Sequence, residues 1–283
     1  YETGHFAVLW KNLAEKIGLE IEWIEGDWRH GADATKIEAL LNKDSEHVIK
    51  GVMVVHNETS TGITSNIPAI RAALDRSKHP ALLLVDVVSS LATTEFRQDD
   101  WGVDVAICAS QKGLMIPPGL GFNSINAKAV NASKQSKSVH AYWRWDRIQE
   151  MNQTGYYPYT PASGLFFGLD EALTMIEEEG LDNLVARHKR LAAACRAATN
   201  KWGLENQCLN PDEYSDSTTA LIIPHGHNAD ELRKYILANF NMSLGSGLGK
   251  LKSKVFRLGH LGDFNELMLL GMLSGVEMGL EKM

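Results

Sequence analysis

Apolar residues along the first two-thirds of the chain alternate between strand-like and helix-like spacing. Residues 6–17 have the helical spacing, whereas residues 20–25 alternate apolar and polar side chains as a half-buried strand does. Asn66, followed by Pro68, predicts the start of a helix that runs to about Lys78. Near-continuous apolar runs predict strands at residues 48–56, 81–86, 103–109 and 121–125. Apolar strands separated by helices are typical of a mostly parallel sheet covered on both faces, so we predict an α/β fold.

The pattern changes at about residue 180. Predicted helices and strands then follow at residues 183–202, 218–224, 230–240, 254–259 and from Asp263 onward. We therefore expect a large α/β domain over residues 1–179 and a smaller C-terminal α+β domain over residues 180–283.

Composition narrows the classes of partner. The 283 residues are 44% hydrophobic, which is enough for a large core, and the net charge of −7 argues against nucleic acid as a partner. The longest apolar run, near residues 267–276, is too short to span a bilayer and is interpreted as a buried helix. The three cysteines have no CxxC or Cys/His ligand spacing, so we expect no disulfide framework, no metal site and a reducing compartment.

Polar clusters follow three of the predicted strands. They are residues 56–59 (HNET), Asp86 with Ser89 and Ser90, and residues 110–112 (SQK). In an open α/β sheet the ligand site lies outside the carboxyl ends of the strands. We therefore expect these side chains to converge on one rim of the sheet.

Lys112 lies just past the apolar strand 103–109 and before the Gly/Pro-rich residues 113–121. A lysine held against apolar neighbours has a lowered amine pKa, which makes it nucleophilic. Taken alone, a solvated surface lysine is the simpler interpretation.

Asp86 ends the most apolar strand, where a carboxylate is poorly solvated and needs a cation or hydrogen-bond donors. A helix or turn cap is an equal alternative. The hydroxyls of Thr59, Ser60 and Thr61 could hold a phosphate or a ring oxygen, although such loops are common. His56 could contact a bound ring, but a structural histidine is the better interpretation.

Arg257 lies within the apolar strand 254–259. A buried guanidinium needs an anion, and its planar fork matches a carboxylate. An internal salt bridge is the alternative, and it is favoured when the residue is considered alone.

Taken together, these residues meet the needs of pyridoxal 5'-phosphate. That cofactor requires a lysine for its aldehyde, a carboxylate for its pyridine nitrogen, donors for its phosphate and an apolar ring face. An aminotransferase adds a cation for the substrate carboxylate.

Longer motifs point the same way. The strings HNETSTG (56–62), VDVVSS (85–90), WGVD (101–104), SQKG (110–113) and FRLGHLG (256–262) occur in this order, with YYPYTP (156–161) and EEGL (178–181) between the last two. They closely resemble the class V aminotransferases, within them the serine–glyoxylate and alanine–glyoxylate group. The resemblance implies the fold type I of pyridoxal-phosphate-dependent transferases.

The resemblance also implies roles for single residues. Lys112 would form the cofactor aldimine and Arg257 would bind the substrate carboxylate. The remaining cofactor contacts would come from Asp86 on the pyridine nitrogen, Val88 on the ring face, Thr59 on the ring hydroxyl and Gln111 on the phosphate. Tyr157 and Thr160 match positions that reach the phosphate of the other subunit's cofactor, which implies a homodimer with shared active sites.

The implied reaction moves an amino group from a small amino acid, serine as first choice, to glyoxylate as the 2-oxo acid. Alanine or aspartate is the alternative donor. A class V desulfurase or a catalytically inactive fragment is a more distant alternative. We expect a cytoplasmic protein, or a peroxisomal one if the source is plant-like.

Two departures from the family pattern stand out. Family members carry a further segment before the point where this chain begins, with a phosphate loop and a ring-stacking aromatic, so we expect this chain to be a fragment. Val87 stands where close relatives often have Gly.

Overall fold

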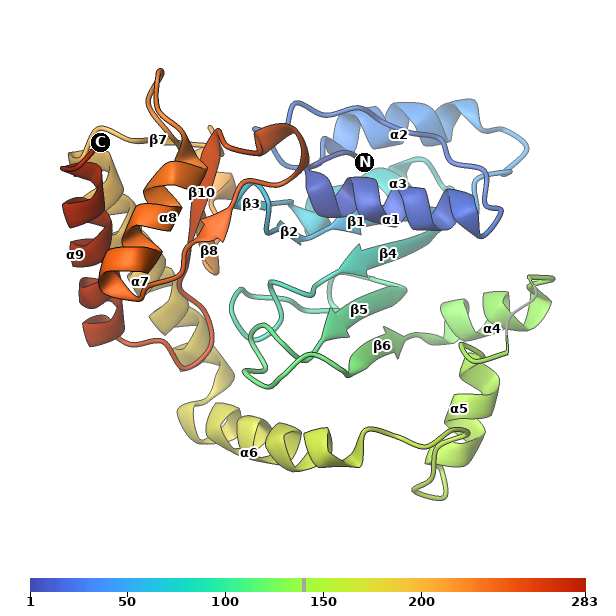
Figure 1. Cartoon of the computed structure of the whole chain (residues 1–283). Helices are drawn as coiled ribbons and strands as arrows, with labels where there is room; N and C mark the ends of the chain where they lie inside the picture. The colour runs from blue at the N-terminus through green and yellow to red at the C-terminus, as the bar shows by residue number, and fades with distance from the viewer. Residues whose placement is uncertain (139–140) are drawn as a thin grey trace.

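The computed structural model describes residues 1–138 and 141–283. Figure 1 shows a central sheet with helices beside it, a second sheet with helices near the C-terminus, and an arm of helices that runs along the bottom and up the right side. The α/β fold predicted from the apolar pattern is confirmed.

The central sheet has the strand order β1-β4-β5-β6. Its strands are β1 (Gly51–Val55), β4 (Leu82–Asp86), β5 (Val105–Ala109) and β6 (Gly121–Ile125). The first three run parallel, and β6 is antiparallel to β5. The sheet is therefore mostly parallel, as predicted, and the carboxyl ends of β1, β4 and β5 lie at one rim. A short hairpin of β2 (Asn57–Glu58) and β3 (Ile63–Thr64) follows β1 at that rim.

Three helices accompany this sheet, α1 (His5–Lys16), α2 (Ala34–Lys43) and α3 (Ile67–Arg76). Asn66 caps α3 by accepting a hydrogen bond from the Ala69 N–H at 3.0 Å, with Pro68 in the first turn, as the sequence predicts. One face of the sheet packs on α2 and α3 through fully buried side chains, among them Ile37, Ile67, Ile70, Leu74, Val54, Leu83 and Val85. Each such side chain contributes roughly 1.5–3 kcal/mol through its burial.

The strand predicted at residues 20–25 is wrong. These residues are extended but form no ladder, and Ile24 accepts one backbone hydrogen bond, from Glu2 N at 2.9 Å. Alternating apolar and polar residues indicate an extended, half-exposed chain, whereas a strand also needs a neighbouring strand to pair with.

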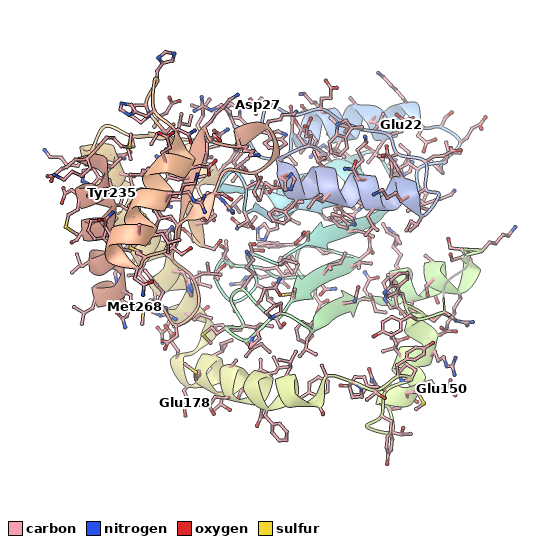
Figure 2. All side chains as sticks on the ribbon, in the orientation of Figure 1. Glu22, Asp27, Glu150, Glu178, Tyr235 and Met268 are labelled. Carbon is pink, nitrogen blue, oxygen red and sulfur yellow. The ribbon has the colours of Figure 1, made fainter. Side chains whose placement is uncertain are left out.

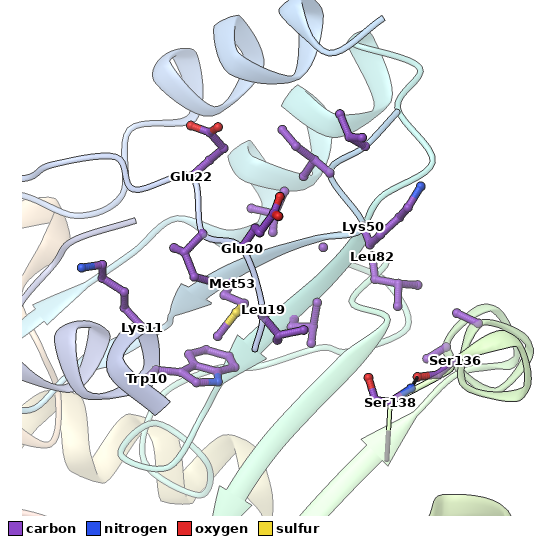
Figure 3. A pocket seen from close by; sticks show the side chains of 18 of the residues that line it. Trp10, Lys11, Leu19, Glu20, Glu22, Lys50, Met53, Leu82, Ser136 and Ser138 are labelled. Carbon is purple, nitrogen blue, oxygen red and sulfur yellow. Dashed lines mark hydrogen bonds between the residues drawn. The ribbon is translucent and has the colours of Figure 1, made fainter. Parts of the chain in front are cut away.

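A cavity of about 1410 Å³ lies between these extended residues and β1. Figure 3 shows Leu19 and Glu20 on one side of it and Met53 and Leu82 on the sheet. Lys112, Asp86, Thr59 and Arg257 do not line it, so this cavity lies away from the rim where the polar residues gather.

The C-terminal sheet is antiparallel, with the order β7-β8-β10-β9. Its strands are β7 (Glu205–Asn206), β8 (Thr218–Ile222), β9 (Gly245–Ser246) and β10 (Val255–Gly259). The helices are α7 (Leu181–Lys201), α8 (Ala229–Phe240) and α9 (Glu266–Leu280), with short 3-10 turns at Pro211–Glu213 and Gly249–Leu251. Phe256, Leu221, Leu232 and Val276 are central to a separate apolar core.

The interpretation of residues 267–276 as a buried helix is only half right. Helix α9 buries Leu269, Met272 and Val276, whereas Leu267 is 79% exposed and Leu270 is 59% exposed. The helix packs on one side only, which an unbroken apolar run does not reveal. Among the described residues, no helix is long and apolar enough to cross a membrane.

The arm consists of α4 (Ala127–Gln135), α5 (Trp145–Asn152) and α6 (Ser163–Glu179), none of which the apolar pattern predicts. In Figure 2, the label Glu150 marks α5 and the label Glu178 marks the end of α6 that leads to the C-terminal part of the chain. Helix α6 leads to α7 through Gly180 at φ 80°. The division into two domains at this glycine stays a prediction.

Candidate active site

The polar clusters after β1, β4 and β5 do converge. Val55 is in register with Asp86, and Asp86 with Ile107, so the residues that follow these strands leave the sheet side by side. The His56 N–H extends the ladder by donating to the Asp86 carbonyl at 2.9 Å. This rim places Lys112, Asp86 and the loop after β1 in one neighbourhood.

The loop that carries Lys112 is closed by Ser110. The buried Ser110 hydroxyl donates to the Pro117 carbonyl at 2.8 Å and accepts from the Leu120 N–H at 3.3 Å. Next to Lys112, Gly113 lies so close to the turn after β4 that an added Cβ would be 2.1 Å from the carbonyl oxygen of Leu91. Only glycine allows this approach, which explains a glycine directly after the lysine.

The amine of Lys112 has a lowered pKa. Burial lowers its pKa, the positive charge of Arg257 lowers it further, and the carboxylate of Asp86 opposes both. Within the described residues, Lys112 Nζ forms neither a hydrogen bond nor an ion pair. A lysine with a lowered pKa has a larger neutral fraction, and the neutral amine is the nucleophile.

Asp86 is a partly buried carboxylate at the end of β4. Its Oδ1 accepts a hydrogen bond from the Val88 N–H at 2.8 Å. Burial raises its pKa to about 6; the Val88 hydrogen bond opposes the rise, Glu58 adds to it and Lys112 opposes it. A carboxylate with this pKa gains stability from a nearby cation.

Thr59 joins this rim to the C-terminal sheet. Its hydroxyl shares a hydrogen bond with the hydroxyl of Ser89 in the turn after Asp86. Its carbonyl accepts a hydrogen bond from Arg257 Nη1 at 3.0 Å. Arg257 therefore reaches the rim although it lies 198 residues away in the sequence.

Arg257 is partly buried in β10 and also donates from Nε to the Ser246 carbonyl at 2.8 Å. No carboxylate of the described residues lies within 4.0 Å of its guanidinium, so the internal salt bridge favoured for the residue alone is wrong. Burial lowers its pKa, which the negative charge of Glu58 opposes. Both of its protein partners are neutral carbonyls, and Nη2 is not used in either bond. The arrangement suits an incoming anion.

His56 has a structural role, as its sequence context suggested. Its Nδ1 is hydrogen-bonded to the Ser90 hydroxyl at 2.9 Å, and its ring packs against Phe96 and Trp101. Burial lowers its pKa to about 4, so the ring is neutral at pH 7.

Gln111 is exposed and Val88 is partly buried, both at the rim. Tyr157 and Thr160 are not brought there. They lie between α5 and α6, where the Tyr157 ring stacks on Phe166 with centroids 5.5 Å apart. No hydrogen bond or ring contact within the described part of the chain joins either residue to Lys112, Asp86 or Arg257.

Some residues that shape the rim were missed by sequence reasoning, namely Glu58, Ser110 and Ser246. Glu58 and Ser110 stand inside polar clusters that the sequence does reveal, so their position was available but their role was not. Ser246 contributes a carbonyl oxygen, which every residue has, so the sequence holds no signal for it.

The three cysteine side chains are buried. Burial raises the pKa of Cys108 and of Cys195 to about 11, and that of Cys208 to about 12. A nucleophilic cysteine needs a lowered pKa and access to solvent. Among residues 1–138 and 141–283, no cluster of three or more His, Cys, Asp or Glu side chains is arranged to hold a metal ion.

Comparison with known proteins gives a consistent picture. The family model described as aminotransferase class-V matches residues 1–249. The serine–glyoxylate aminotransferase of Methylorubrum extorquens is 46% identical over 282 residues, which are 98% of this chain and 70% of that protein. The L-aspartate–glyoxylate aminotransferase of Paracoccus denitrificans is 42% identical over 98% of this chain and 70% of its own length.

A solved structure is similar over the same extent. The ureidoglycine–glyoxylate aminotransferase of Bacillus subtilis superposes with a TM-score of 0.88 at 26% identity, over 99% of this chain and 72% of that one. The sequence and the arrangement of helices and strands are therefore both similar to those of these aminotransferases.

Proposed function

The chain belongs to the class V aminotransferases, and from this premise we propose that it moves an amino group from serine to glyoxylate with pyridoxal 5'-phosphate as cofactor. One observation carries the proposal. The positive charge of Arg257 lowers the pKa of Lys112 at a partly buried rim, and neither side chain forms an ion pair with a carboxylate of the described residues. An amino acid supplies that missing carboxylate.

The residues at the rim fit the cofactor. The Lys112 amine forms no hydrogen bond or ion pair within the described residues. The raised pKa of the Asp86 carboxylate favours a cationic partner such as a protonated pyridine nitrogen. Further contacts would come from the Thr59 hydroxyl to the ring oxygen, the Val88 side chain to the ring face and Gln111 to the phosphate. When bound, the cofactor supplies an aldehyde that accepts an amine and an electron-poor ring that stabilises charge on the neighbouring carbon.

The chain's own groups divide the remaining work. Arg257 holds the substrate carboxylate in a bidentate contact and so orients the Cα–H bond. Lys112 Nζ, once neutral, takes the proton from Cα and returns it as general base and then acid. Asp86 stays ionised beside the pyridine nitrogen and stabilises its positive charge.

We further propose that two copies of the chain share their active sites. Tyr157 and Thr160 are exposed on the arm and form no hydrogen bond or ring contact with Lys112, Asp86 or Arg257 of their own chain, as expected of residues that serve a neighbouring subunit. The same arm exposes several large aromatic side chains, with Tyr142 at 61%, Trp143 at 71% and Phe167 at 81% exposure. Exposed apolar groups gathered in this way are typical of a protein–protein interface.

A donor panel tests the function. Purified protein with added cofactor and glyoxylate is given serine, alanine or aspartate, and glycine and the matching 2-oxo acid are quantified. We expect the highest kcat/KM with serine. A preference for aspartate or alanine would assign that amino acid as the donor. No transfer from serine, alanine or aspartate would contradict the proposal.

Desulfurase chemistry is a weaker candidate, since it requires a nucleophilic thiol and all three thiol pKa values are raised. Release of sulfide from cysteine, measured alongside the donor panel, would revive it. The inactive-fragment alternative predicts no transfer and no cofactor binding, which the same samples reveal.

A further inference from the structure

Glu58 is a fully buried carboxylate directly beside Thr59. Its Oε1 accepts hydrogen bonds from the Ser60 hydroxyl at 2.6 Å and the Ser60 N–H at 3.1 Å. Its Oε2 accepts from the N–H groups of Phe6 and Ala7, each at 3.1 Å. The carboxylate therefore has four donors, which come from two separate parts of the chain.

One of these parts is the N-terminal turn of α1. The residue before this helix is Gly4, which has no side chain to cap it. Glu58 and Ser60 take over that role, since the Ser60 hydroxyl also accepts from the His5 N–H at 2.9 Å. A carboxylate is favoured at this end of a helix, because the free N–H groups and the helix dipole are positive there.

The second part is the turn between β2 and β3. The Glu58 carbonyl accepts hydrogen bonds from the N–H groups of Thr61 and Gly62, at 3.2 and 2.9 Å. Thr59 is thus enclosed by a turn whose first residue is anchored through both its backbone and its side chain. The residue before α1 lies very close to this turn, since a Cβ on Gly4 would be 2.5 Å from Glu58 Cγ and 2.4 Å from Ser60 Oγ.

We propose that Glu58 is a positioning residue for substrate binding: by locking the turn onto α1 it fixes the Thr59 carbonyl, which in turn orients the guanidinium of Arg257. This inference rests on the proposed function, because Arg257 is there the group that binds the substrate carboxylate. Glu58 forms no hydrogen bond or ion pair with Arg257, so its positioning effect passes through Thr59.

The charge of Glu58 adds a second effect. Burial raises the pKa of Glu58 itself, and where Glu58 is ionised its negative charge raises the pKa of Asp86 and opposes the lowering of the pKa of Arg257. Replacing Glu58 by an uncharged residue therefore lowers the pKa of Asp86, whereas a purely structural residue elsewhere in the sheet leaves it unchanged.

Glu58→Gln is the main test, with Asp104→Asn as matched control. Asp104 is likewise a buried carboxylate that accepts a backbone N–H, from Leu83 at 2.8 Å, but it precedes β5 at the opposite end of the sheet. Both variants lose an anion from a buried hydrogen-bond network, so both are expected to lower the melting temperature. Only Glu58→Gln is expected to disturb Arg257.

We expect Glu58→Gln to raise the KM for both the amino donor and glyoxylate by roughly 5- to 20-fold, since both use Arg257, with kcat changed by less than about 3-fold. Binding of glyoxylate to the cofactor-free protein, measured by calorimetry, is expected to weaken in parallel. The acid limb of cofactor affinity is expected to move to lower pH in Glu58→Gln and to stay in place in Asp104→Asn.

A KM and a glyoxylate affinity in Glu58→Gln equal to those of Asp104→Asn would overturn the inference. If Glu58→Gln does not fold, Ser60→Ala removes one donor of the same network and is expected to shift KM in the same direction by a smaller factor. A wild-type chain that binds glyoxylate but transfers no amino group would contradict the proposed function while leaving the role of Glu58 open to the calorimetric test.

Discussion

Arg257 Nη1 donates a hydrogen bond of 3.0 Å to the carbonyl oxygen of Thr59, and this bond joins the C-terminal sheet to the rim of the central sheet. The bond has two consequences. It holds the guanidinium of Arg257 where its positive charge lowers the pKa of Lys112. It also gives the guanidinium a carbonyl as its partner, and no carboxylate of the described residues pairs with it. The site therefore combines a guanidinium that can bind an anion with a nucleophilic amine.

Arg257→Ala removes the proposed carboxylate contact. We expect the KM of the amino donor to rise about 10- to 100-fold, the range that corresponds to a charge-assisted hydrogen bond, with little change in cofactor affinity. Steady-state kinetics and a cofactor titration measure the two. Arg190→Ala, an exposed arginine paired with Glu266, serves as control. Equal kinetics in the two variants would assign Arg257 a structural role.

Lys112→Ala removes the amine that is proposed to react with the cofactor aldehyde. After borohydride treatment, mass spectrometry of the wild-type protein is expected to find the reduced cofactor covalently attached to the peptide that contains Lys112. The variant is expected to carry none, whereas Lys234→Ala on the exposed face of α8 behaves like the wild type. Attachment that persists in Lys112→Ala would refute the assignment.

Asp86→Asn is expected to stabilise the cofactor-free protein while it weakens cofactor binding. The pKa of Asp86 is raised from 3.8 to about 6, so between these values the folded state holds the proton more tightly than the unfolded state. The wild type therefore loses stability as pH rises through this window, on the order of 1–3 kcal/mol. The variant escapes this loss.

The difference in unfolding free energy between Asp86→Asn and the wild type should grow between about pH 4 and pH 6, stay constant above about pH 6 and vanish below about pH 4. Denaturant unfolding at a series of pH values measures it. A difference that is the same at every pH would mean that Asp86 is not a buried, unpaired carboxylate in the free protein.

Gly113→Ala tests how the Lys112 loop is held. Its new Cβ would lie 2.1 Å from the Leu91 carbonyl oxygen, so the loop must move away from the turn after Asp86. We expect a loss of roughly 2 kcal/mol or more in stability and a strong loss of cofactor binding. Gly121→Ala, which meets nothing within 4 Å, should stay within about 0.5 kcal/mol of the wild type.

Shared active sites predict complementation. Lys112→Ala and Tyr157→Ala are each expected to be impaired alone, but a mixed dimer would contain one site with both native residues. Co-expression with two affinity tags, followed by isolation of the mixed dimer, is therefore expected to restore about half of the wild-type activity, or about a quarter in an unseparated, randomly mixed population. Activity that does not exceed the sum of the parent variants would place Tyr157 outside the neighbouring site.

Much of the fold was predictable because burial leaves a periodic pattern in the chain. The strand β6 was predicted residue for residue, and α3 was predicted from Asn66 and Pro68 because a cap and a fixed φ act locally. Helix α6 was missed, since its apolar residues surround it without a clear stripe. The segment at residues 20–25 has the spacing of a strand, but pairing depends on a neighbour that spacing does not encode.

The sequence by itself determined which side chains stand at the ends of β1, β4 and β5, and parallel strands make such ends meet. It also determined that Lys112, Asp86 and Arg257 have the chemical types that the reaction needs. Only the tertiary structure decided that Arg257 has the Thr59 carbonyl as partner instead of a carboxylate, and that the Glu58 carboxylate accepts hydrogen bonds from the first turn of α1. These contacts join residues far apart in the chain, and their geometry depends on how two sheets pack, which no local pattern specifies.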